Sequence, residues 1–137
     1  MSARRSAWFA ALATILMAGC LGIGPCSETE AFAFNAIRHY GDAELVPEPH
    51  PSGACGAGLV SGDDPDAVIE HYRSELERVG FVVTPPESAP IVDGAGAVVG
   101  RTLTLWATTE TATASVNAEI LDGQGDTTFV ILTNETD

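Results

Sequence analysis

The sequence predicts an α+β fold in which two helices pack on a mainly antiparallel sheet with a C-terminal meander of three strands. The clearest helical pattern covers residues 65–79, where apolar side chains recur every three or four positions. Residues 101–133 instead alternate between apolar and polar side chains and are interrupted by short turns, which is typical of antiparallel strands. The length of 137 residues suits one domain.

The first helix is predicted over residues 28–40. Ser27 and Glu30 have the spacing of a capping box, in which each side chain binds the backbone amide of the other residue. Gly41 follows at a position where glycine often ends a helix. Because phenylalanines alternate at positions 32 and 34, a strand remains the alternative for this segment.

The second helix is predicted after a proline-rich loop over residues 42–54 and a short strand over residues 55–61. We expect Asp64 to cap this helix, Pro65 to occupy its first position and Gly80 to end it. The spacing predicts a buried side made of Val68, Ile69, Tyr72, Leu76 and Val79.

Four further strands are predicted, over residues 81–83, 101–109, 112–121 and 127–133. Residues 85–100 are expected to form a loop, with at most a brief strand over residues 89–92. In the first long strand, Leu103 and Leu105 should point to one side of the sheet and Trp106 to the other, because successive side chains alternate.

The N-terminal segment has the features of an export signal. Arginines near the start precede an apolar stretch over residues 7–18, which is shorter than the roughly 20 residues that a spanning helix needs. The sequence LMAGC at residues 16–20 resembles the lipobox of prokaryotic lipoproteins, although Met17 stands where leucine is usual. A plain signal peptide, in which Cys20 is incidental, is the alternative.

The resemblance to prokaryotic lipoproteins implies a lipid anchor on Cys20. Residues 1–19 would be the signal peptide, residues 20–25 a lipidated tether and residues 26–137 a single α+β domain, similar to small extracytoplasmic α+β modules. The partner of Cys20 would be the lipid bilayer, and the protein would lie at the outer face of the cell membrane. A diacylglyceryl group supplies two acyl chains, and stable anchoring takes about two such chains.

Three cysteines leave an odd thiol unless one is modified. With lipid on Cys20, we expect Cys26 and Cys55 to form a disulfide, because disulfides persist outside the cytoplasm. Closing a loop of about 30 residues would stabilise the fold by roughly 3–4 kcal/mol. Two free thiols are the alternative.

The chain is strongly acidic. It has nineteen aspartates and glutamates, six arginines and no lysine, which gives a net charge of −13. This balance argues against nucleic acid as a partner, because cationic contacts to phosphate supply much of that affinity. The acidity is either a solvated surface or an adaptation to high salt, where charges are screened. The composition resembles proteins of salt-loving archaea and also lysine-poor proteins of GC-rich bacteria.

No sequence motif for catalysis or metal binding is found. The histidines are His39, His50 and His71, and they form no HExxH pattern. The glycine-rich residues 94–100 lack the spacing and context of a dinucleotide site. The acidic residues 63–66 and 122–126 offer too few oxygen ligands for Ca²⁺. We therefore predict no catalytic residue, no metal and no cofactor.

The predicted function is a membrane-anchored, non-enzymatic binding or interaction module whose protein partner is unidentified. The alternatives are an enzyme with an unrecognised carboxylate site, and a structural protein of the cell envelope. Trp106, an aromatic residue among threonines, is the candidate contact residue. Packing beneath the first helix would instead bury it. Asn134 begins an N-glycosylation sequon that ends at Thr136.

Overall fold

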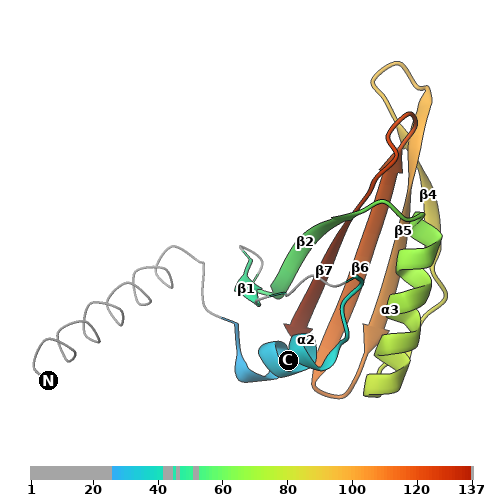
Figure 1. Ribbon diagram of the computed structural model, residues 1–137. Helices are drawn as coiled ribbons and strands as arrows, with labels where there is room; N and C mark the ends of the chain where they lie inside the picture. Colours follow the sequence, from blue (N-terminus) through green and yellow to red (C-terminus); the bar gives the residue numbers. More distant parts are fainter. Residues whose placement is uncertain (1–25, 42–44, 46, 51–52, 137) are drawn as a thin grey trace, which may run out of the picture.

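The computed structural model describes residues 26–41, 45, 47–50 and 53–136, which form two helices and one seven-stranded sheet (Figure 1). The helices are α2 (Glu28–Ala36) and α3 (Pro65–Val79). The strands are β1 (Glu48–Pro49), β2 (Cys55–Ser61), β3 (Val82–Val83), β4 (Glu87–Val92), β5 (Val98–Thr108), β6 (Ala112–Leu121) and β7 (Thr127–Glu135). The predicted class, two helices on a mainly antiparallel sheet, is confirmed.

The strands follow the order β1-β2-β7-β6-β5-β3, and β4 also pairs with β5. Each pair is antiparallel, and β5, β6 and β7 form the expected meander. The last of these strands, β7, lies between β6 and β2 rather than at an edge. Helix α3 connects β2 on one side of the sheet to β3 on the other, so the chain crosses one whole face (Figure 1).

Both helices lie on the same face of the sheet (Figure 1). The core forms between them and the inward side chains of the strands, because alternate residues of each strand point the same way. Its largest fully buried apolar side chains are Phe34, Val68, Tyr72, Leu76, Leu105, Val116, Phe129 and Ile131. Burying a side chain of this size contributes roughly 1.5–3 kcal/mol.

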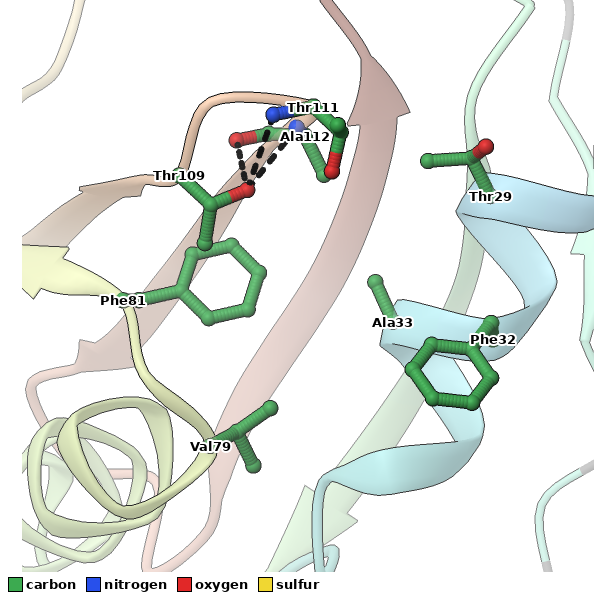
Figure 2. A pocket seen from close by; sticks show the side chains of 8 residues that line it. All are labelled: Thr29, Phe32, Ala33, Val79, Phe81, Thr109, Thr111 and Ala112. Carbon is green, nitrogen blue, oxygen red and sulfur yellow. Dashed lines mark hydrogen bonds between the residues drawn. The ribbon is translucent and has the colours of Figure 1, made fainter.

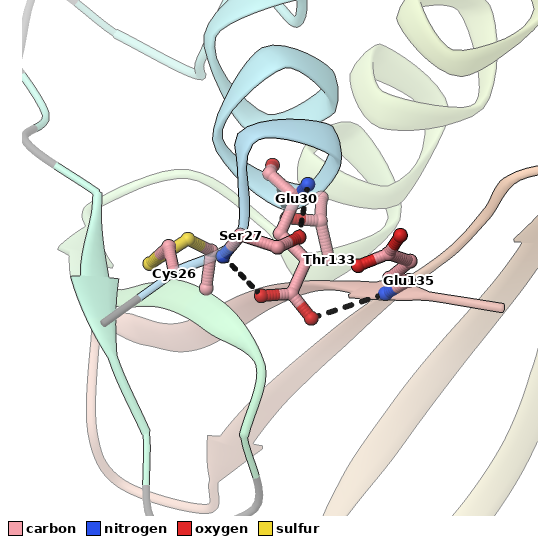
Figure 3. The surroundings of a disulfide bond; sticks show 6 residues. Cys26, Ser27, Glu30, Thr133 and Glu135 are labelled. Atoms are coloured by element: carbon pink, nitrogen blue, oxygen red, sulfur yellow. Dashed lines mark hydrogen bonds between the residues drawn. A yellow bond between two sulfur atoms is a disulfide. The ribbon is translucent and has the colours of Figure 1, made fainter. Parts of the chain in front are cut away.

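Helix α2 is attached to the sheet at its first turn (Figure 3). The predicted capping box is present: the Glu30 backbone N–H donates to Ser27 Oγ at 3.1 Å, and the Ser27 N–H donates to Glu30 Oε1 at 2.8 Å. The Glu135 N–H on β7 donates to Glu30 Oε2 at 3.1 Å, and Thr133 Oγ1 donates to the Glu30 carbonyl at 2.9 Å. The buried Glu30 therefore joins the helix cap to the central strand.

The predicted disulfide is formed between Cys26, just before α2, and Cys55, the first residue of β2. Their Cα atoms are 5.3 Å apart, and Cys55 is completely buried. The disulfide ties the start of α2 to β2, and Glu30 ties the same end of the helix to β7. The start of α2 is therefore attached to two neighbouring strands.

Helix α2 ends at Ala36, four residues earlier than predicted. The Arg38 N–H donates to Glu75 Oε1 at 2.8 Å, and the Tyr40 N–H donates to the Tyr72 hydroxyl at 2.9 Å. These amides bind side chains of α3 instead of helical carbonyls, so tertiary contacts override the local helical pattern.

Helix α3 matches its predicted limits. Asp64 caps it and accepts a bond from the Asp66 N–H, Pro65 starts it, and Gly80 ends it with a φ of 108°. A left-handed φ of this kind suits glycine. The predicted inward side chains are buried, with Val79 partly so.

The loop predicted over residues 85–100 is shorter than expected, because the brief strand allowed over residues 89–92 extends over Glu87–Val92 and the next strand begins at Val98 instead of Arg101. Strand β4 pairs with β5, which begins at Val98, and a short turn held by Asp93 connects the two strands. Most of these residues are exposed, so the hairpin carries no clear alternation of buried and exposed positions. Pro90 lies on the edge strand β4, where a missing N–H is tolerated.

We predict that Glu30→Ala destabilises the fold by about 2–3 kcal/mol, because two backbone amides lose their acceptor. The matched control is Glu28→Ala on the exposed first turn, which should cost at most about 1 kcal/mol through the helix dipole. Urea unfolding followed by circular dichroism, with the disulfide intact, measures both. Equal losses in the two variants would contradict the role assigned to Glu30.

Candidate functional site: the outer face of the sheet

The face of the sheet opposite both helices is the candidate site, and we call it the outer face. Because successive side chains of a strand point to opposite faces of the sheet, the strand register identifies the residues that lie on the outer face. They are Thr102, Thr104, Trp106 and Thr108 on β5; Thr113, Ser115, Asn117 and Glu119 on β6; Thr128, Val130, Leu132 and Asn134 on β7; Gly56, Gly58 and Val60 on β2; Glu87 and Ala89 on β4; Val82 on β3; and Glu48 on β1.

The strand register arranges these residues in rows that run across the sheet. Trp106 lies opposite Ser115, which lies opposite Leu132, which lies opposite Gly56. With strands about 4.8 Å apart, this row is about 14 Å long. Gly56 carries no side chain, so the row is flat at that position, and Glu48 on β1 lies opposite Gly56 and extends the row.

Trp106 is the most prominent residue of the outer face. Its side chain is 52% exposed, and no helix covers it, so the alternative of packing beneath the first helix does not apply. The Thr84 N–H donates to its carbonyl at 2.9 Å, which holds the backbone behind the ring. A depression of about 140 Å³ lies beside the indole. Its other lining residues are Ala54, Thr113, Ala114, Ser115, Leu132 and Asn134.

Two neighbouring details shape the surface around Trp106. In the next row, Asn117 Nδ2 donates to Thr104 Oγ1 at 3.0 Å, which fixes the direction of that amide. On β2, in the Trp106 row, a Cβ on Gly56 would lie 2.4 Å from the Ile131 carbonyl oxygen and 3.0 Å from the imidazole of His50. Glycine is therefore required there for steric reasons, and His50 lies over it.

The charge on the outer face is acidic and lies away from Trp106. Of the residues assigned to this face, Glu48, Glu87 and Glu119 are charged and none is basic. Much of the charge lies on α3 and its cap, in ion pairs such as Arg73 with Glu70 and Glu77. Arg101 pairs with Asp66 at 2.7 Å and so lowers the pKa of that carboxyl.

A second hollow of about 170 Å³ lies between the two helices (Figure 2). Its lining residues are Thr29, Phe32, Ala33, Val79, Phe81, Thr109, Thr111 and Ala112, none of which titrates. Phe32 is 78% exposed at its rim, whereas Phe34 is buried in the core. This groove was not identified from the sequence. The available signal was Phe32 and Phe34, because side chains two positions apart on a helix point in different directions and one of the two must be exposed.

His39 has a structural role between α2 and α3. Its Nε2–H donates to the Phe34 carbonyl at 3.0 Å, so its Nδ1 accepts from the Tyr72 hydroxyl at 3.3 Å. Burial lowers the pKa of His39, and burial also raises the pKa of Tyr72. His71 is likewise engaged, because its Nε2–H donates to the Arg38 carbonyl at 2.5 Å.

The other predicted sites are placed as follows. Cys20 lies outside the described residues, and Cys26 and Cys55 form the disulfide. Asn134 is exposed and lines the depression beside Trp106. Within the part of the chain that the structure describes, no three His, Cys, Asp or Glu residues are grouped to hold a metal. No helix in that part is long and apolar enough to cross a membrane.

Comparison with known protein families, with characterised proteins and with solved structures finds no match. The chemistry of the outer face and the N-terminal sequence are therefore the features from which a function can be inferred.

We predict that Trp106 is open to solvent in the folded protein. Trp8 is the other tryptophan, so Trp8→Phe in the full chain makes Trp106 the sole one. Acrylamide should quench its fluorescence about half as strongly as in the same protein unfolded in guanidinium, because about half of the side chain is exposed. Strong shielding would show that the indole is covered.

We also predict that stability falls as the pH falls below about 6.5, the usual pKa of histidine. Because the folded pKa of His39 is lowered, the unfolded chain binds the proton more readily, and stability is lost down to that lowered folded pKa. His39→Gln should flatten this part of the pH profile in urea unfolding. The carboxylates of α3 that pair with arginine titrate at lower pH, so the loss of stability in that lower range should be the same in the wild type and in His39→Gln. An unchanged profile in His39→Gln would contradict the assignment.

Proposed function

We propose that this protein is a non-enzymatic binding module, held at the outer face of the cell membrane by lipid on Cys20, with the outer face of its sheet as the contact surface. The observation that carries the proposal is Trp106, half-exposed on a sheet face that neither helix covers. Exposed tryptophans anchor many binding surfaces.

The position of the anchor supports this arrangement. The described chain begins at Cys26, which the disulfide ties to the α2 end of the sheet (Figure 3). Six residues from Cys20 to Cys26 reach at most about 20 Å. The α2 end would therefore face the bilayer, and the strands would rise away from it. The outer face would stand upright and open sideways to the cell envelope.

The contacts of the buried Glu30 favour a binding protein over an enzyme that uses carboxylates. An enzyme built on carboxylates needs two acidic groups held together in a protected pocket. Among the described residues, Glu30 is the buried acid, and backbone amides of Ser27 and Glu135 occupy both of its oxygens. The depression beside Trp106 and the groove beside Phe32 have no acidic residue in their linings.

The anchor is tested by the intact mass of the protein from the membrane fraction, before and after reduction. We expect a chain that begins at Cys20, carries added lipid and gains two hydrogens on reduction of the single disulfide. Cys20→Ser should abolish the lipid and release the protein from membranes, while the disulfide stays. An unlipidated chain in the wild type would reject the anchor.

A further inference from the structure

The outer face combines one exposed indole with many neutral polar groups. Eight of its residues are threonine, serine or asparagine. They are Thr102, Thr104, Thr108, Thr113, Ser115, Asn117, Thr128 and Asn134. Hydroxyl and amide groups both donate and accept hydrogen bonds, so this surface can match a ligand that does the same at many points.

This chemistry restricts the ligand. A nucleic acid or a phosphate headgroup requires cations, and none of the residues assigned to the outer face is basic. A lipid surface requires an apolar face, whereas neutral polar side chains outnumber apolar ones here. The centre of a protein interface is about 65% apolar by area, whereas most of the residues assigned to this face are neutral polar or acidic. A neutral polyhydroxyl compound agrees with all three observations.

We propose that the outer face binds a neutral carbohydrate chain, with one sugar ring stacked on Trp106; this inference rests on the proposed role of the face as the contact surface. The C–H groups on one side of a sugar ring are apolar and slightly positive, so they attract the negative face of an indole. The depression beside Trp106 receives that sugar, and Ser115, Thr113 and Asn134 bind its hydroxyl groups.

A second sugar lies along the strand direction, over Thr104 and Asn117. Thr104 is two residues from Trp106 on β5, a rise of about 7 Å. The bond from Asn117 Nδ2 to Thr104 Oγ1 orients the amide before the ligand arrives, so little side-chain freedom is lost on binding. The surface thus favours an oligosaccharide over a single sugar.

The charge of the chain selects against acidic sugars. The net charge is −13, Glu119 lies on the outer face in the row beyond Asn117, and Glu87 on β4 lies opposite Thr104. Repulsion from these carboxylates weakens the binding of a uronic acid polymer, most strongly at low salt, where screening is least. Neutral glycans lack this penalty.

The binding experiment uses the full chain with Trp8→Phe, so that Trp106 reports on its own surroundings. Neutral oligomers of glucose, mannose and N-acetylglucosamine are titrated at pH 7, with oligogalacturonate as the acidic comparison. Intact mass first shows that no sugar is attached to Asn134. At least one neutral oligomer should shift the emission to shorter wavelength in a saturable manner, and oligogalacturonate should bind at least tenfold more weakly at low salt.

Calorimetry then compares variants with the same oligomer. Trp106→Ala should weaken binding at least tenfold, and Asn134→Ala severalfold. Phe32→Ala is the matched control, because it removes another exposed aromatic residue from the helical side and should leave binding unchanged. If Phe32→Ala weakens binding as much as Trp106→Ala does, the assigned surface is wrong. If no neutral oligomer binds at 10 mM, the carbohydrate proposal is overturned.

A labelling experiment separates failure of the ligand class from failure of the contact surface. Thr104→Cys is treated with a membrane-impermeant maleimide in intact cells and as purified protein, with Ser74→Cys on exposed α3 as the control. Protection of Thr104→Cys in cells alone, without carbohydrate binding, would reject the ligand class and keep the contact surface. Equal labelling in cells and in the purified protein would reject both.

Discussion

The attachment of α2 to the sheet is the constraint on which the rest of the structure depends. The disulfide from Cys26 ties the helix to β2, and the buried Glu30 ties it to β7 through the carboxylate and its own carbonyl. A nine-residue helix is too short to be stable in water by itself, so it needs such tertiary contacts. They hold α2 beside α3 and complete the layer that covers one face of the sheet.

Because the two helices cover only one face of the sheet, the two sides of each strand carry different kinds of residue. The buried side chains of β5 and β6 belong to leucine, valine and alanine, whereas the outward ones are mostly threonine, serine and asparagine. Neutral polar side chains keep an uncovered sheet soluble without placing like charges side by side on adjacent strands. Many acidic residues lie instead on α3, at its cap and in turns, where water solvates them, and those on the outer face are Glu48, Glu87 and Glu119.

Features governed by local chemistry could be predicted from the sequence, and features governed by contacts between distant segments could not. Asp64 and Gly80 define α3 by short-range rules, and alternation alone separates Trp106 from Leu105. The early end of α2 could not be foreseen, because it depends on the hydroxyl of Tyr72, thirty-two residues from Tyr40. Alternation also could not show which sheet face the helices cover, so the exposure of Trp106 required the structure.

The central position of β7 has a consequence for the order of folding. The two cysteines of the bridge are separated by 29 positions in the first half of the chain, so oxidation can close that loop early. The sheet, however, is completed only when β7 inserts between β2 and β6. Pairing of such distant segments is slow. The centre of the sheet therefore stays open until the C-terminal strand is available, so complete folding has to wait for nearly the whole chain.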